Sequence, residues 1–260
     1  MWNFLALASL LLLAPAEVTI ESLDGSRTTG QLISLSGDIL TVESSEGPVE
    51  IPFQQLLTVQ PITPPDPLPA EASSWIELLD GSLLEATAVE IKEGTLEATI
   101  RSGARVSIKT RNIRYTRLVE LDPEKLADFQ QITKAEAEGD VLIIRRPSGA
   151  LDELEGIVHS LDDTILVFEF DDEKIQVERT KIAGIRYFQA GSRKLPEPRC
   201  LVSLAGNVTL FAATLELAEQ QLTVTCSAGP KVTIPLDHLV KLDFSAGNLV
   251  YLSDLEPKQS

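Results

Sequence analysis

One pattern of glycines and apolar residues occurs four times in this sequence, and that internal repeat limits the folds the chain can adopt. Each copy begins at a turn glycine, and the four glycines are Gly25, Gly81, Gly149 and Gly206. Three apolar positions then follow at nearly constant spacing: Leu40, Leu96, Ile165 and Leu222; Ile51, Ile108, Val177 and Ile234; Leu56, Ile113, Ile182 and Leu239. A repeat of this length indicates an array of small structural units.

The second copy shows most clearly what one unit contains. Apolar and polar residues alternate in short segments that turns separate, which is the period of half-buried strands. This pattern predicts strands over residues 75–79, 83–91, 96–100, 106–108 and 113–118. The gap between the last two segments is too short for a helix, so it predicts a single tight turn.

Five short strands with a tight turn before the fifth resemble a small SH3-like or Sm-like barrel. We therefore predict an all-β chain of four tandem five-stranded barrels over residues 17–61, 74–118, 138–189 and 197–245. Units of this size lie near the lower limit for independent folding. Neighbouring units are therefore expected to pack on each other or to exchange edge strands.

Two connecting segments differ from the repeats. Residues 62–73 continue a proline-rich stretch with five prolines between positions 61 and 69, which predicts an extended, semi-rigid linker. Residues 119–137 contain one short predicted helix, with Asp122 as the N-cap, Pro123 at the first helical position and Gly139 as the residue that ends it. This helix is expected to act as a hinge between two pairs of units.

Charge and the N-terminal segment bear on partners and location. The formal net charge is −17, from 39 acidic against 22 basic residues. No nucleic-acid partner is expected, because such a partner requires a basic surface. The densest basic stretch, residues 109–117, alternates along one predicted strand and indicates a solvated face.

Residues 1–16 resemble a secretory signal peptide. The apolar run over residues 4–13 is too short to span a bilayer, and Ala14-Pro15-Ala16 supplies the small residues that a signal peptidase reads. We predict an exported protein that is periplasmic, cell-surface or extracellular and has no integral membrane span after cleavage.

The two cysteines, Cys200 and Cys226, both lie in the fourth unit. Each occupies an apolar strand face, so both thiols are expected to point into one core. In an oxidising compartment they could form a disulfide worth about 3 kcal/mol. The alternative is that they are two buried thiols acting as small apolar side chains.

No catalytic, cofactor-binding or metal-binding residue is predicted. His159 and His238 lie in different units, without a second ligand at zinc spacing. His159 alternates with Ile157 and Leu161, which predicts that the three share a face and that His159 is a partly buried histidine with a hydrogen-bond partner. The acidic segments 162–163 and 171–173 are expected to be exposed turns. We therefore predict that the chain is not an enzyme and needs no cofactor.

Four aromatic residues lie at the ends of their strands or units. Trp75 opens a strand beside the linker, while Tyr115, Tyr187 and Phe188 are expected to pack against the next unit.

The C-terminal segment over residues 244–257 resembles the lead-in to the NPCBM type of carbohydrate-binding module, which occurs in exported bacterial proteins. In that family a stretch close to residues 247–257 introduces a β-sandwich, and repeats of this type can precede it. The resemblance implies that this chain is the front part of a longer protein or a truncated relative. Because the sandwich itself is absent, no sugar-binding residue is transferred to residues 246–260.

These observations predict a secreted, non-catalytic scaffold or spacer built from β repeats, which presents a carbohydrate-binding domain. The alternative is that the repeats themselves bind a cell-surface glycan or a peptide, through an edge strand or a groove between units.

Overall fold

The computed structural model describes residues 16–69, 74–191 and 193–245, and this part of the chain is all-β apart from one α-helix. Its twenty strands belong to one hydrogen-bonded antiparallel sheet system. We group them into four modules of five strands. Module 1 contains β1 (Glu17–Ser22), β2 (Arg27–Ser36), β3 (Ile39–Ser44), β4 (Gly47–Pro52) and β5 (Leu56–Pro61). Module 2 contains β6 (Ser74–Leu78), β7 (Leu83–Lys92), β8 (Thr95–Ile100), β9 (Arg105–Lys109) and β10 (Ile113–Arg117).

The other two modules repeat this series of strands. Module 3 contains β11 (Asp140–Arg145), β12 (Leu151–Leu161), β13 (Ile165–Phe170), β14 (Glu173–Glu178) and β15 (Ile182–Arg186). Module 4 contains β16 (Cys200–Leu204), β17 (Val208–Ala218), β18 (Gln221–Cys226), β19 (Lys231–Pro235) and β20 (Leu239–Asp243). Residues 1–15 of the predicted signal peptide, which spans residues 1–16, lie outside the described residues, and so does the C-terminal segment over residues 246–260.

Every module follows the same path. Its first four strands pair in sequence, and its fifth strand pairs back onto the first. A single 3₁₀ turn precedes each fifth strand: η1 (Phe53–Gln55), η2 (Thr110–Asn112), η3 (Arg179–Lys181) and η4 (Leu236–His238). The long second strand carries a bulge in each module, which lets it bend and pair along both halves. The turn η2 lies between positions 108 and 113, which confirms the tight turn predicted there.

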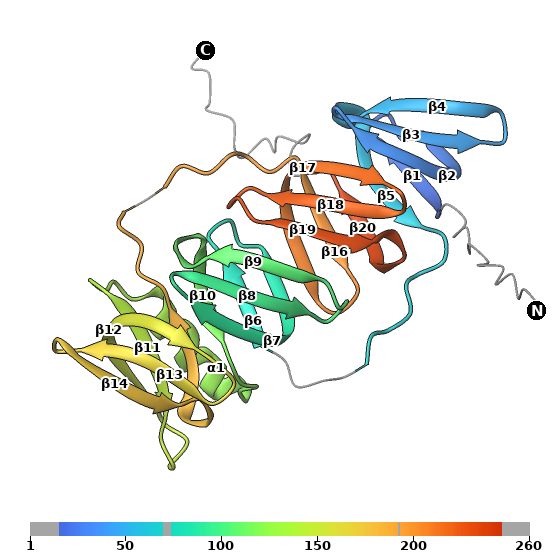
Figure 1. The fold of residues 1–260 in the computed structure, drawn as a ribbon. Helices are drawn as coiled ribbons and strands as arrows, with labels where there is room; N and C mark the ends of the chain where they lie inside the picture. The colour runs from blue at the N-terminus through green and yellow to red at the C-terminus, as the bar shows by residue number, and fades with distance from the viewer. Residues whose placement is uncertain (1–15, 70–73, 192, 246–260) are drawn as a thin grey trace, which may run out of the picture.

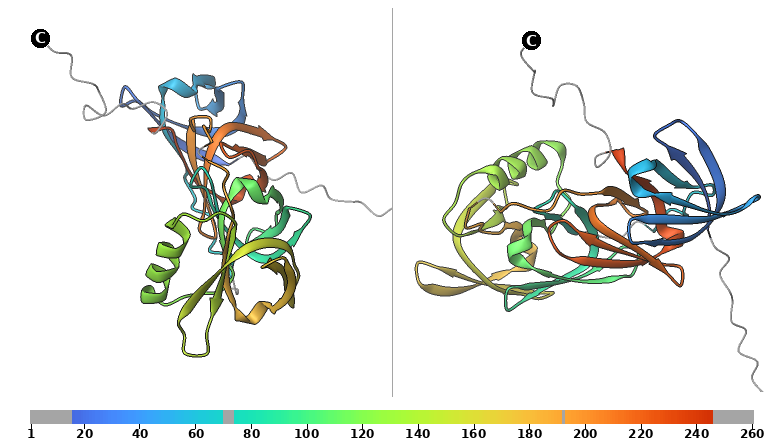
Figure 2. Two further views of the ribbon diagram at one scale, coloured as in Figure 1. Left: turned by 90° about the vertical axis from the view of Figure 1, so that its left-hand side faces the viewer. Right: turned by 90° about the horizontal axis from the view of Figure 1, so that it is seen from above.

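The modules lie in one row whose order differs from their order in the chain (Figures 1 and 2). The fifth strand of module 1, β5, pairs with β20 of module 4, while β10 of module 2 pairs with β15 of module 3. A ladder contact between β7 and β17 joins modules 2 and 4. The resulting order is 1, 4, 2, 3, so module 1 packs against the last module and not against its neighbour in sequence.

Modules 1 and 4 dock through the same strand positions as modules 2 and 3. Val59 faces Leu242, and Thr116 faces Ile185, and each of these is the fourth residue of its strand. A second contact joins the ends of the long strands, where Leu35 faces Leu217 and Ile91 faces Leu161. Because like positions face like positions, each pair has the geometry of a two-fold dimer interface within one chain.

The helix α1 (Pro123–Lys134) begins as predicted, since the Asp122 carboxylate accepts a hydrogen bond of 2.9 Å from the Lys125 amide and Pro123 follows it. It ends at Lys134, before Gly139, because the chain from Ala135 onward is extended. Phe129 on this helix is fully buried in a small second core with Val141, Ile143 and Ala183 of module 3. The expected hinge between two pairs of units is therefore wrong: α1 lies inside the docked pair of modules 2 and 3.

One large apolar core runs through all four modules. It includes Phe244, which follows β20 and packs on Phe53 of module 1 with ring centroids 5.0 Å apart. The Phe244 amide also donates to the Leu57 carbonyl at 2.9 Å. These contacts fasten the end of the fourth module to the first. No helix among the described residues has the length and apolar character needed to cross a membrane.

Candidate functional site

A groove of about 1090 Å³ lies between the proline-rich linker and module 4. We call it the linker groove. One wall is the start of module 1 and the linker, and the other is the β17–β18 turn with η4. Its lining residues are Ala16, Glu17, Pro61, Thr63, Pro64, Pro65, Asp66, Pro67, Leu68, Glu219, Gln220, Gln221, Pro235, Leu236, Asp237 and His238.

The linker is held at both ends, so this wall is fixed in place. The Ile62 amide donates to the Glu17 carbonyl at 2.9 Å. At the other end, the Arg101 guanidinium of module 2 donates to the carbonyls of Leu68, at 3.0 Å, and Pro69. Between these anchors the proline rings restrict the backbone to extended conformations.

His238 is one of the residues that line the groove. Its Nδ1 atom is buried and lacks a hydrogen-bond partner, while its Nε2 atom lies 3.9 Å from the Asp237 carboxylate. Buried polar atoms are normally hydrogen-bonded, so the unpartnered Nδ1 is an unusual feature of this lining residue. His238 belongs to η4, and the sequence gave no sign of the groove because its two walls are far apart in the chain.

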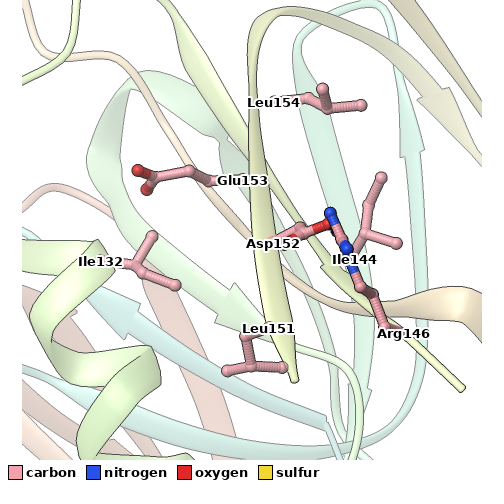
Figure 3. A pocket seen from close by; sticks show the side chains of 7 residues that line it. All are labelled: Ile132, Ile144, Arg146, Leu151, Asp152, Glu153 and Leu154. Atoms are coloured by element: carbon pink, nitrogen blue, oxygen red, sulfur yellow. Dashed lines mark hydrogen bonds and ion pairs between the residues drawn. The ribbon is translucent and has the colours of Figure 1, made fainter. Parts of the chain in front are cut away.

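A smaller cavity of about 560 Å³ lies between α1 and the β11–β12 hairpin (Figure 3). Aliphatic and charged side chains share its lining, and the ion pair between Arg146 and Asp152 lies at one side. Its other lining residues are Ile132, Ile144, Leu151, Glu153 and Leu154.

The position of this cavity explains its origin. Glu153 of module 3 occupies the same position on the second strand as Leu83 of module 2 and Thr209 of module 4. Leu83 and Thr209 face each other across the interface between modules 2 and 4. In module 3 this docking edge has no further module on it, so a hollow remains beside α1.

The junction of modules 2 and 4 contains the most buried charged group of the described structure. The Glu85 side chain is 6% exposed and lies 3.2 Å from the Arg101 guanidinium, which is 12% exposed. The Asn207 amide of module 4 donates to the same carboxylate at 2.9 Å. Two neighbouring bonds cross the junction, from the Phe211 amide to the Ser82 hydroxyl at 2.9 Å and from the Ala228 amide to the Asp80 carboxylate at 2.7 Å.

His159 has the hydrogen-bond partner that the sequence predicted. Its Nε2 atom lies 2.8 Å from the Glu169 carboxylate, and the side chain is partly buried. The expectation of a common face with Ile157 and Leu161 is wrong, because Leu161 is buried while Ile157 is 52% exposed. The strand register shifts between Val158 and Ser160, so this bulge breaks the alternation at His159.

The acidic segments of module 3 form turns at opposite ends of β13. The Asp162 carboxylate accepts hydrogen bonds of 2.7 Å from the Thr164 and Ile165 amides, and these bonds hold its pKa below the ordinary value. No cluster of three or more metal-ligating side chains occurs among the described residues.

The aromatic residues follow the predicted packing in part. The Arg117 guanidinium lies 3.5 Å from the Trp75 ring centroid, and Tyr115 contacts Phe129 of α1 edge-on. The buried Tyr187 hydroxyl lies 3.4 Å from the Thr116 hydroxyl of module 2, across the module junction. Phe188 does not follow the prediction, since it is 41% exposed.

Both cysteines are buried, free thiols in this structure, which matches the second of the two alternatives and not the disulfide. Cys200 and Cys226 each pair with Ala212, from opposite sides of the strand β17. Two strand spacings separate them by about 10 Å, beyond the roughly 7 Å that a disulfide tolerates between Cα atoms.

This arrangement predicts slow reaction of both thiols with alkylating reagents. Burial raises the pKa of Cys226 to about 12, and it raises the pKa of Cys200 as well, so the reactive thiolate is scarce near neutral pH. In native protein, mass spectrometry should find neither cysteine modified by iodoacetamide, whereas both should react in denaturant. Rapid native labelling, or failure to label in denaturant without reductant, would contradict this.

No family model matches the chain, and a search of the curated proteins found no match either.

Proposed function

We propose that the chain is a non-catalytic scaffold made of four SH3-like or Sm-like barrels, over residues 17–61, 74–118, 138–189 and 197–245. The order of strands, the 3₁₀ turn before the fifth strand and the return of that strand to the first support this reading of each module. The scaffold is exported, and the sequence of residues 246–260 resembles the segment that introduces a carbohydrate-binding module of the NPCBM type.

The two-fold pairing of corresponding strands is the observation that carries the proposal. Modules 1 and 4 hold both the first and the last strand of the described chain, and the pair of modules 2 and 3 extends away from them (Figure 1). Module 3 therefore lies at the end of the row away from module 1, at a fixed distance from the first and last described strands. This arrangement suits presentation of a surface more than flexible tethering.

Calorimetry on the whole chain tests this function. Shared strand ladders couple the modules, so the protein should unfold in a single transition whose calorimetric and van't Hoff enthalpies agree. Separate transitions for single modules would show a flexible string and overturn the scaffold. Turnover of glycan or peptide substrates by pure protein, lost in His159→Ala, would overturn its non-catalytic character.

A second function, ligand binding by the repeats themselves, is favoured by one specific observation. The linker groove exceeds the size of most small-ligand pockets and lies between module 1, the linker and module 4.

A further inference from the structure

We propose that the linker groove binds an extended basic peptide, with arginine or lysine side chains between apolar residues. This inference rests on the proposed scaffold, because the groove exists only while modules 1 and 4 are docked. Three properties of the lining identify this ligand class: charge, hydrogen-bonding capacity and apolar surface.

The charge of the lining has a single sign. Four carboxylates surround the groove, from Glu17, Asp66, Glu219 and Asp237, and no lysine or arginine lines it. All four residues are exposed, so each attraction is weak alone. Together, in a concave site, they attract cations and disfavour anions.

The backbone of the linker wall offers acceptors rather than donors. Pro61, Pro64, Pro65 and Pro67 have no amide hydrogen, and Pro235 across the groove has none either. Guanidinium and ammonium groups are purely hydrogen-bond donors, so they match this wall and the carboxylates together.

The remaining lining is apolar and fixed. Proline rings, Leu68 and Leu236 are among the lining residues, and this apolar surface suits the aliphatic side chains of an extended segment. The hydrogen bonds at Ile62 and Leu68 fix both ends of the linker wall before any ligand arrives. A preformed groove avoids the ordering cost that weakens binding to flexible sites.

Fluorescence anisotropy with two labelled probes tests the assignment. The first is a short peptide of repeating proline, leucine and arginine, and the second has glutamate in place of arginine. The basic probe should bind and the acidic probe should not. Raising the salt from about 0.1 M to about 1 M shortens the Debye length from about 10 Å to about 3 Å, so binding should weaken.

A pair of charge-matched variants localises the site. Asp66→Asn with Asp237→Asn removes two carboxylates from the groove and should weaken binding about fivefold, at about 0.5 kcal/mol for each exposed charge. Asp171→Asn with Asp172→Asn removes the same charge from the exposed β13–β14 turn of module 3 and should leave binding unchanged.

Three results would overturn the proposal: equal binding of both probes, equal weakening in both variants, or binding of a neutral oligosaccharide in place of the basic peptide. If the basic probe fails while the calorimetric transition stays single, only the peptide site is wrong. If the modules unfold separately, the scaffold itself is wrong.

Discussion

Replacing Gly184 with alanine should destabilise the protein by about 3 kcal/mol and loosen module 3 from module 2. Gly184 is a buried residue of β15 that faces Arg117 of β10 across the module junction. A Cβ atom at this position would lie 2.5 Å from the Thr116 carbonyl and 2.7 Å from the Phe129 ring. Both neighbours are fixed, the first by the strand ladder and the second by burial beneath α1.

Gly184→Ala is destabilising because the cost of the steric contact exceeds the stabilisation that alanine normally gives over glycine. Alanine normally gains about 0.5–1 kcal/mol over glycine in a strand, because it restricts the unfolded chain. A contact of 2.5 Å with a backbone oxygen requires strands to move, and this cost exceeds that gain. Urea unfolding of Gly184→Ala gives the loss of stability, and amide exchange in β10 reports the loosened junction.

Gly149→Ala is the matched control for this change. Gly149 lies in the β11–β12 turn of the same module, and a Cβ there would meet nothing within 4 Å. Its φ of 86° costs about 1 kcal/mol for alanine. Equal losses in the two variants would show that Gly184 does not hold open a junction between modules.

The second large effect is expected for Arg101→Ala, with a loss of about 3 kcal/mol. This change removes the guanidinium from the buried Glu85 carboxylate and leaves that charge in a poorly solvated junction. It also releases the end of the linker, because Arg101 donates to the Leu68 carbonyl. Thermal unfolding would measure the loss, and weaker binding of the basic probe would report the change in the groove.

An exposed ion pair supplies the comparison. Arg27 lies 3.4 Å from Glu21 in module 1, and its side chain is 72% exposed. Solvent screens this pair, so Arg27→Ala should cost no more than about 0.5 kcal/mol. Replacing both buried partners, as Glu85→Leu with Arg101→Met, should recover part of the loss because no buried charge remains at the junction. A loss for Arg101→Ala as small as that for Arg27→Ala would refute the role of this network.

The local structure could be predicted from the sequence because local physics determines it. Alternating residues such as Leu96, Ala98 and Ile100 bury one face of β8, and the proline and N-cap at the start of α1 need no distant partner. The bulge at His159 could not be foreseen, since a register shift depends on the partner strand as well as on the bulged one.

The order of the modules could not be predicted for a related reason. Equivalent strands have similar apolar patterns, so nothing local distinguishes pairing of β5 with β20 from pairing with β10. The linker groove depends on this order, because its walls come from residues 16–68 and 219–238. The five prolines between positions 61 and 69 mark one wall in the sequence, but nothing local connects them with residues 219–238.

The first and last modules pair through their fifth strands, and a disulfide tests this pairing directly. Thr58 faces Asp243 in the β5–β20 ladder, where opposed Cα atoms lie about 4.5–5.5 Å apart and suit a disulfide. Arg117 is the fifth residue of β10 in module 2, as Asp243 is the fifth residue of β20. Arg117 faces Gly184 of module 3, so it would face Thr58 only if modules 1 and 2 paired. Under mild oxidation, Thr58→Cys with Asp243→Cys should form an intramolecular disulfide, while Thr58→Cys with Arg117→Cys should not. A disulfide in the second variant and not the first would show that sequence neighbours pair, and would contradict the proposed order of the modules.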